Sequence, residues 1–536
     1  MSDGNMKIDF DLECGHPAAN VETAGGAVKT TKKDQEKKYE DREDTDSREI
    51  DNTPDVHENL QKEATEEVPK TLFGTLCEVF KYFYSVVLLA FSVTVVMAAV
   101  FTKQTTATGE DGNIPTFVAC VVFWFLICWL AMMEGGQGAL VGLKPVKKTL
   151  YNGSHPRALK CTSLAHKGDN MERFIVGRQF LVVLVVFVIN LLASATADAS
   201  VLNLNDGLAE VFLSSGVAVI LTTITLGQLA AQINAAKCML DFINNYFMVF
   251  TTYVSLAIEM SGLLHAVYLV QMFFAAMTGK PVASNEPPRT VLQSVFFWMR
   301  IFMSVVILGF AFAVTLKALF SGKTTMYEGV PEVISVILFF LLMCFVGMME
   351  GMQIALFAVV NLPEEELIQH TIAHKNCQLT FKGNNLGAFL IGRQICVTVF
   401  MFVVARITTI DVGTDAGEES IFGLGTGIQS FFNTGLLGAL ITTIVGSLAW
   451  RIIASSFPIA FLSNPLIYVI IRTCLILEQS GICSAAWILA RIHKVVVNFQ
   501  DDEIHIGGSS VATNSENDTS SSEKAMDMDI SPSTEQ

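Results

Sequence analysis

The chain has 536 residues, of which 51% are hydrophobic and only 16% are charged, and its mean hydropathy is +0.47. Soluble domains usually carry about 25% charged residues, so this composition excludes a string of soluble domains. The net charge of −16 lies in the two ends, because residues 1–71 hold 19 acidic and 10 basic side chains and residues 500–536 hold 9 and 1. No Lys/Arg-rich face remains to neutralise phosphates, which excludes a nucleic-acid partner.

The two polar ends predict disordered tails. Both are rich in Asp, Glu, Ser, Thr and Lys and poor in aromatic residues, so they cannot bury enough apolar surface to order themselves. We expect a tail over residues 1–71 and another over residues 498–536. The N-terminal residues are polar, so no cleavable signal peptide is expected.

Ten apolar segments between the tails are long enough to cross a bilayer as helices, which takes about 20 residues. The sequence therefore predicts an all-α polytopic membrane protein embedded in a lipid bilayer. The predicted spans are residues 77–101, 116–143, 174–197, 208–233, 242–277, 291–320, 331–362, 387–408, 421–449 and 452–497.

A duplicated pattern divides these spans into two units of five. Three motifs return in the same order at nearly constant offsets of 216, 215 and 219 residues, and chance does not give three such matches. They are Met-Met-Glu-Gly-x-Gln at 132–137 and 348–353, Gly-Arg-Gln at 177–179 and 392–394, and Glu-x-Ser-Gly at 259–262 and 478–481. The fifth and tenth spans are too long for one straight crossing, so a kink or an end projecting into water is expected at Glu-x-Ser-Gly.

The predicted units are residues 72–277 and 291–497, joined by a loop over residues 278–290. Five is an odd number of crossings, so the chain enters the second unit from the opposite side of the membrane. We therefore expect the second unit to be inverted relative to the first. The loop at 144–173 carries seven Lys/Arg and two acids, whereas the loop at 364–382 carries two bases and three acids. The positive-inside rule then puts the first loop and both termini in the cytoplasm and the second loop outside.

The charged residues of the repeated motifs lie at or near the ends of apolar spans. A carboxylate at bilayer depth costs roughly 3 kcal/mol and must face protein or water. We expect pairing within each unit, Glu134 with Arg178 and Glu350 with Arg393. The alternative is that all four are membrane-edge residues that extend their charged ends to the interface.

Uncharged donors and acceptors surround these charges. Each glutamine amide offers two donors and an acceptor, and the i, i+3 spacing puts Gln137 on the helix face of Glu134. The glycines remove side-chain bulk, so backbone groups can approach a ligand, although glycine is also common where membrane helices touch. The pattern favours a small, uncharged, polyhydroxylated solute. The residues concerned are Gln137, Gln179, Gln353, Gln394, Gly135, Gly177, Gly351 and Gly392.

Two threonine pairs, Thr222-Thr223 and Thr442-Thr443, lie within the fourth and ninth spans. Their oxygens suit a hard cation such as sodium. The alternative is that each hydroxyl bonds back to its own helix.

With both copies of Glu-Gly-x-Gln and Gly-Arg-Gln intact, residues 72–499 resemble the silicon transporters of silicifying protists. The resemblance implies uptake of orthosilicic acid, a neutral tetrahedral tetrol, with sodium cotransport. It also implies that these motifs bind the substrate. Many members end in a coiled coil, but residues 500–536 lack heptads, and the oligomeric state stays open.

We therefore expect a sodium-coupled symporter that takes up orthosilicic acid by alternating access, with the first-unit residues open to one face and the second-unit residues to the other. No organic cofactor and no metal beyond sodium are expected, and the plasma membrane is the expected location. A channel for another small neutral solute is the alternative. An intramembrane enzyme and an ATP-driven pump are disfavoured, because the sequence has no HExxH, GxSxG or GxxxxGK[ST] motif.

Overall fold

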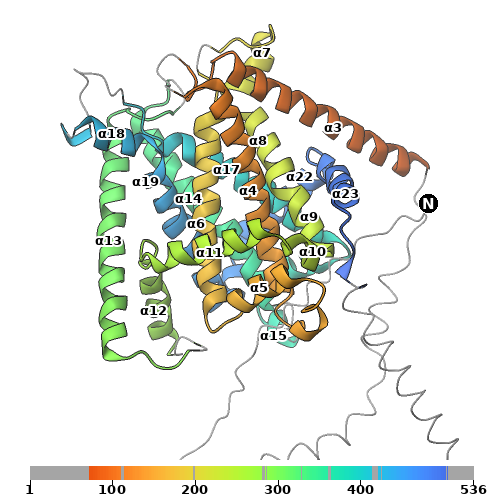
Figure 1. Cartoon of the computed structure of the whole chain (residues 1–536), viewed down its shortest axis with the longest axis vertical. Coiled ribbons are helices and arrows are strands. Elements are labelled where there is room, and N and C mark those ends of the chain that lie inside the picture. The colour runs from red at the N-terminus through yellow and green to blue at the C-terminus, as the bar shows by residue number, and fades with distance from the viewer. Residues whose placement is uncertain are drawn as a thin grey trace, which may run out of the picture. The chain divides into compact units, whose positions relative to one another are not determined.

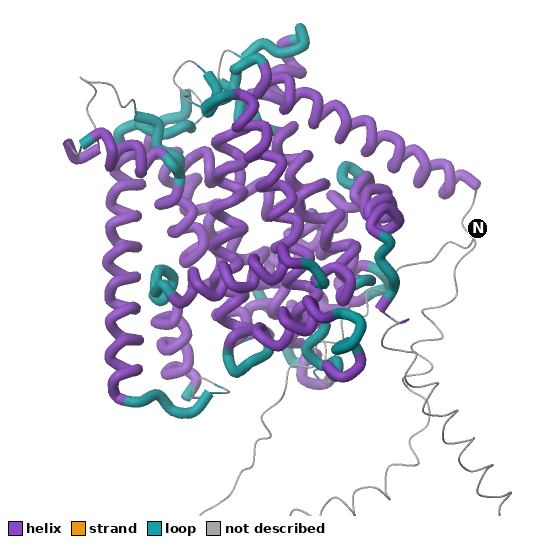
Figure 2. The backbone as a smooth tube through the Cα atoms, in the orientation of Figure 1, coloured by secondary structure: helices purple, strands orange, loops and turns teal. Residues whose placement is uncertain are grey.

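The computed structural model describes residues 72–504, apart from residues 110–113, 197–198, 280–283, 285, 327–328, 360–361, 363, 413–420, 424 and 503. The predicted tails therefore lie almost wholly outside the described residues. From Phe80 onward the described chain forms one compact unit, to which the account below is confined. Its described segments are helices joined by loops and turns, with two isolated β-bridges. Figure 2 shows the helices in purple.

Eight helical segments of the described chain are long and apolar enough to cross a membrane. Helices satisfy their own backbone hydrogen bonds, which a bilayer interior demands. Six are single helices: α3 (Leu72–Phe101), α4 (Thr116–Gly142), α6 (Asn170–Ala193), α13 (Val291–Phe320), α14 (Glu332–Val359) and α17 (Asn385–Thr408).

The other two spans are composite. Val217–Lys237 joins α8 (Val217–Ile224) and α9 (Ala230–Lys237) through a π-helical turn, and Leu436–Ser456 joins α19 (Leu436–Ile441) and α20 (Ala449–Ser456) in the same way. Shorter helices link the spans: α5 (Pro156–Ala165), α7 (Asp206–Ala209), α10 (Met239–Ile243), α15 (Glu364–Ile368), α16 (Thr371–Phe381), α18 (Thr426–Asn433) and α21 (Pro458–Leu462).

The predicted fifth and tenth crossings are wrong, because each is a pair of short helices. The first pair is α11 (Tyr246–Met260) with α12 (Val267–Thr278), and the second is α22 (Pro465–Gln479) with α23 (Ala485–Val497). At 1.5 Å per residue, 15 and 12 residues reach about 22 and 18 Å, less than the ~30 Å hydrocarbon core. Each break falls at the Glu-x-Ser-Gly motif, as the sequence predicts, where Gly262 and Gly481 have φ of +89° and +74°.

Each half forms hydrogen bonds to the turn of the helical hairpin in the other half. On α13, the Ser304 hydroxyl donates to the Leu263 carbonyl (2.7 Å) and accepts from the Ala266 N–H (2.9 Å). On α3, Ser85 makes the same two bonds with the backbone of the second break. In addition, α12 packs on α20 and α23 packs on α9. The hairpins therefore lock the halves together, and backbone groups exposed by each break find partners.

The predicted inversion is also wrong, because corresponding helices run in the same direction. Arg173, at the start of α6, donates to Glu286 (2.8 Å) in the segment just before α13, so α6 and α13 begin at the same end of the bundle. At the far end, Arg406 near the end of α17 donates to the carbonyl of Ser214, which precedes α8. Figure 1 accordingly places α5 and α15 at one end and α7 and α18 at the other. The reason is that each hairpin enters and leaves at one end, which leaves four crossings, an even number, per half.

The described C-terminal residues fold back onto the first half. Asp502 accepts from the Met239 and Leu240 N–H groups at the start of α10 (2.6 and 3.0 Å), and the Gln500 N–H donates to Asp241 (2.7 Å). Residues 498–502, which the sequence assigns to a tail, are thus part of the folded body.

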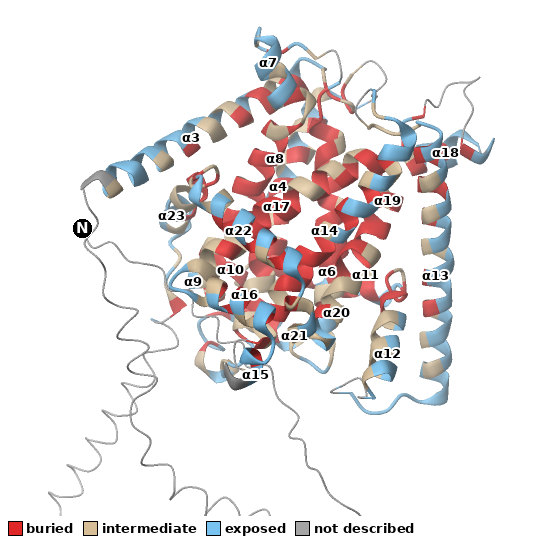
Figure 3. Cartoon of the chain, turned by 180° about the vertical axis from the view of Figure 1, so that it is seen from behind, coloured by how far each residue is buried: buried red, intermediate tan, exposed pale blue. Residues whose placement is uncertain are grey.

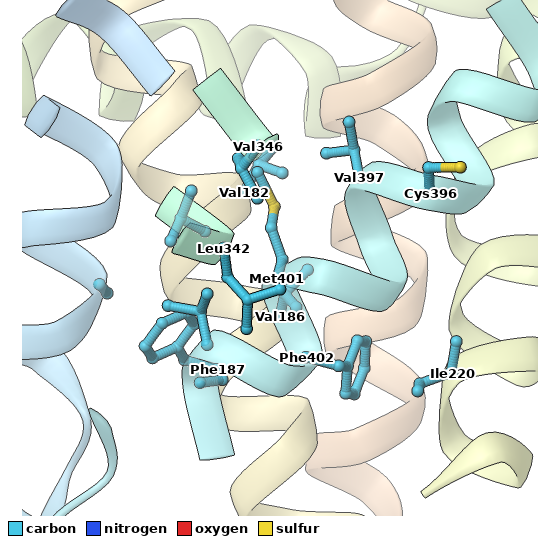
Figure 4. Packing of buried hydrophobic residues seen from close by; sticks show 14 of the residues in the cluster. Val182, Val186, Phe187, Ile220, Leu342, Val346, Cys396, Val397, Met401 and Phe402 are labelled. Atoms are coloured by element: carbon cyan, nitrogen blue, oxygen red, sulfur yellow. The ribbon is translucent and has the colours of Figure 1, made fainter. Parts of the chain in front are cut away.

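The core lies where α6 and α17 cross the middle of the bundle (Figure 3). Figure 4 shows side chains of α6, α14 and α17 meeting there, with Ile220 of α8 beside them. Val186, Val346 and Phe402 are at most 3% exposed, so no water-sized gap separates these helices. Because this core fills the half of the bundle toward α7 and α18, it leaves room for a site only nearer the α5 end.

The orientation of the halves predicts a labelling result. Cysteines introduced at the exposed Lys160 and Lys375 should both react with a membrane-impermeant thiol reagent from the same side, and a cysteine at Asp206 should react from the opposite side. The measurement is labelling of intact cells and of inverted vesicles, with the wild type as background. Opposite labelling of Lys160→Cys and Lys375→Cys would contradict the parallel arrangement.

Candidate functional site

A cavity of about 150 Å³ lies between the two halves, and both repeated motifs contribute to its wall. One water molecule occupies roughly 30 Å³ in the liquid, so the cavity holds a solute of a few heavy atoms. Its polar wall consists of Glu134, Gln137, Arg178, Gln179, Gln228, Gln232, Glu350, Gln353, Arg393, Gln394 and Arg451, and Trp487 completes one side.

In the first half, two side chains hold one oxygen of the Glu134 carboxylate. Arg178 Nη2 lies 2.6 Å from Glu134 Oε2, and Gln232 Nε2 donates to the same oxygen at 2.9 Å. The other nitrogens of Arg178 donate to the Met133 carbonyl (3.1 Å) and to Gln179 Oε1 (3.2 Å). Both charged side chains are buried, so these bonds offset the loss of hydration.

In the second half, the carboxylate of Glu350 is held mainly by a different arginine. Arg451 donates to Glu350 Oε2 from Nε (3.0 Å) and Nη2 (2.6 Å). Arg393, the partner expected from the sequence, has its Nη1 3.7 Å from Glu350 Oε1 and donates from Nη2 to Gln394 Oε1 (3.0 Å). Both expected ion pairs are present, but the second is the looser and Glu350 has two cationic neighbours.

Sequence reasoning missed Gln232 and Arg451. They occupy equivalent positions, 219 residues apart, in Ala-Ala-Gln and Ala-Trp-Arg of the composite spans. Their equivalence could have been found from the sequence, because 219 is also the offset between the two Glu-x-Ser-Gly motifs that follow. It was overlooked because the residue is a glutamine in one half and an arginine in the other. Gln228, which accepts from Thr398 of the other half (2.6 Å), was missed as well.

The four glutamines singled out from the sequence all line the cavity. Gln179 and Gln394 each accept a hydrogen bond from the arginine that precedes them, so their carbonyl oxygens are occupied. Gln137 and Gln353 are half-buried in the wall, one turn beyond Glu134 and Glu350. They offer amide donors and acceptors to a solute.

The glycines mostly serve helix contacts. A Cβ at Gly177 would collide with the Ser255 carbonyl of α11, and one at Gly392 with the Cys474 carbonyl of α22. These two glycines therefore let the hairpins approach α6 and α17 closely. Gly135 lines the cavity and also lies against a phenylalanine of α10, while Gly351 lies against the equivalent phenylalanine of α21.

The threonine pairs lie outside the cavity wall: Thr222 and Thr223 precede the first π-helical turn, and Thr442 and Thr443 begin the second. Thr222, Thr442 and Thr443 each donate to the carbonyl four residues earlier at 2.8 Å, as the back-bonding alternative holds. Thr223 differs, because its buried hydroxyl finds no hydrogen-bond partner among the described residues.

The ion pairs predict unequal costs of removing the two carboxylates. Glu134→Ala strands one arginine, whereas Glu350→Ala strands Arg393 and Arg451. Stranding one buried charge costs about 3–5 kcal/mol, so Glu350→Ala should lower the melting temperature in detergent further than Glu134→Ala does. As a control, Glu134→Ala/Arg178→Ala should recover part of the loss of Glu134→Ala. Equal melting temperatures for the two single variants would contradict this charge arrangement.

A comparison with protein families matches residues 74–534 to the family described as silicon transporter, which covers most of the chain. No match was found among curated proteins or among solved structures. The match includes both halves, the eight crossing segments and every residue of the cavity wall. The chain therefore belongs to the silicon transporter family.

Proposed function

We propose that this protein is a symporter that takes up orthosilicic acid together with sodium by alternating access. The observation that carries the proposal is the cavity between the halves, in which amides and ion pairs of both halves surround a space of about 150 Å³. Family membership supports a transporter for silicon. Uptake of a solute from outside the cell requires the transporter to lie in the plasma membrane.

The chemistry of the wall supports a neutral tetrol as the solute. Orthosilicic acid has five heavy atoms and four hydroxyl groups, each of which donates and accepts hydrogen bonds. Gln137 and Gln353 offer amides from opposite halves of the cavity, so one tetrahedral molecule meets donors and acceptors on two sides. The acids in the wall already have arginine partners, so a cationic solute is disfavoured.

Charge supports a cytoplasmic position for the α5 end. The sequence between α4 and α6 carries six basic residues, which the positive-inside rule places in the cytoplasm. In the sequence, the stretches between α3 and α4, α6 and α8, α13 and α14, and α17 and α19 carry two basic and ten acidic residues: Lys103 and Lys323, and Glu110, Asp111, Asp198, Asp206, Glu210, Glu328, Asp411, Asp415, Glu418 and Glu419. With four crossings per half, both termini are then cytoplasmic.

The position of the cavity supports an inward-facing state. Arg178 lies eight residues into α6, about 12 Å from its cytoplasmic end, and the buried core of Val186 and Phe402 lies on the external side. In parallel repeats, rocking of one half against the other moves such a closure from one side of the site to the other. The motifs of both halves then serve the same site in both states, rather than one face each.

Sodium coupling draws support from the family resemblance and from the threonine oxygens. Sodium is a hard cation that prefers oxygen ligands. Thr223 carries a buried hydroxyl without a hydrogen-bond partner among the described residues, next to a π-helical turn. We propose Thr223 as a sodium ligand, with Thr222, Thr442 and Thr443 as further candidates.

Reconstitution tests the function. Purified protein in liposomes should accumulate silicic acid above equilibrium with an inward sodium gradient and only equilibrate without one. A channel would equilibrate the solute at any sodium distribution and never accumulate it. Uptake no faster than that of empty liposomes would overturn the proposal.

Substitution of the cavity glutamines tests solute binding separately from folding. Gln137→Ala and Gln353→Ala each remove one or two hydrogen bonds worth about 0.5–1.5 kcal/mol, so each should weaken silicic acid binding roughly tenfold with an unchanged melting temperature. The exposed Gln378→Ala on α16 is the control and should change neither. Wild-type affinity in both cavity variants would show that the amides are not ligands.

The sodium site has its own test. Thr223→Val removes the hydroxyl but keeps the shape, so the sodium concentration for half-maximal uptake should rise roughly tenfold, which corresponds to about 1.4 kcal/mol. Thr94→Val is the matched control, because Thr94 is exposed on α3 and bonds back to Ala90. An unchanged sodium dependence would remove Thr223 from the site.

A further inference from the structure

The two halves of the cavity differ at one equivalent position. Gln232 in the first half and Arg451 in the second both donate to the motif carboxylate, the first at 2.9 Å to Glu134 and the second at 2.6 and 3.0 Å to Glu350. Because the amide of Gln232 is uncharged, the negative charge of Glu134 is neutralised by Arg178. The guanidinium neutralises Glu350 by itself.

This difference changes what the motif arginines do. Arg178 uses three nitrogens, on Glu134, on Gln179 and on the Met133 carbonyl. Arg393 uses only Nη2, on Gln394, and its Nε and Nη1 have no hydrogen-bond partner among the described residues. Its Nη1 stays 3.7 Å from Glu350.

The unbonded N–H groups of Arg393 require a hydrogen-bond acceptor. Arg393 is only 6% exposed and lies in the cavity wall, and its Nε and Nη1 are not accessible to water. A buried charged donor left unbonded costs free energy, and such groups in folded proteins are normally satisfied by protein, water or ligand. The wall also carries three arginines against two glutamates, so it favours an oxygen atom with acceptor character at this position.

We propose that Arg451 is a positioning residue that engages Glu350 and so leaves the Arg393 guanidinium free to turn toward the cavity and donate from Nε or Nη1 to an oxygen of the solute. Silicic acid would then bind off-centre, with one oxygen on Arg393 and its other hydroxyls toward the glutamines. This inference rests on the proposed function, since it concerns the same solute.

An exchange of the two residues tests the proposal. In Arg451→Gln, the second half acquires the residues of the first, Arg393 pairs with Glu350, and binding of orthosilicic acid measured by calorimetry should weaken roughly 10- to 100-fold. Arg451→Lys keeps a cation on Glu350 and should bind within a few-fold of wild type. In Gln232→Arg/Arg451→Gln, Arg178 becomes the free arginine, and binding should recover most of the loss.

A second measurement does not depend on the solute. Arg393→Gln should lower the melting temperature more in the Arg451→Gln background than in the wild type, because Glu350 has no other cation there. Equal shifts in both backgrounds would overturn the proposed change of partner.

The outcomes separate this inference from the function on which it rests. If wild type does not bind silicic acid, the proposed function fails, and the melting temperatures still decide whether Arg451 controls Arg393. If wild type binds but Arg451→Gln binds equally well, the inference fails and the function stands. An exchange variant no better than Arg451→Gln, with the fold intact, also overturns it.

Discussion

Burial of two carboxylates inside an apolar helix bundle is the constraint on which the rest of the structure depends. Glu134 and Glu350 are at most 9% exposed, and an ionised carboxylate at that depth needs cationic or hydrogen-bonding partners close by. Those partners come from α6 or α17 and from α9 or α20. The charges therefore fix which helices meet, and the meeting point of these helices is the cavity.

The re-entrant hairpins complete this arrangement. Each is too short to cross, so its break exposes backbone groups that a serine on the first helix of the other half satisfies. The halves are interlocked at these contacts, while the cavity lies between them.

The sequence predicts the helical class correctly, because composition is a local property of the chain. The ion pairs expected from the repeated motifs are present in the structure. Length and hydropathy did not reveal that the fifth and tenth segments turn back, since an apolar hairpin and an apolar span have the same composition. That one error changed the number of crossings per half from four, which is even, to five, which is odd, and so inverted the second half in the prediction. The motif pairs Glu134–Arg178 and Glu350–Arg393 were predictable, whereas Arg451 was missed, because its equivalent in the first half is the uncharged Gln232 and the two do not form a repeated motif.

The central claim is that both halves build one binding site for one solute. The most direct measurement is the stoichiometry of orthosilicic acid binding to the purified protein at saturation, determined by equilibrium dialysis. The shared cavity predicts one molecule of silicic acid per chain. Two molecules per chain would mean that each motif set forms its own site, and would contradict the account.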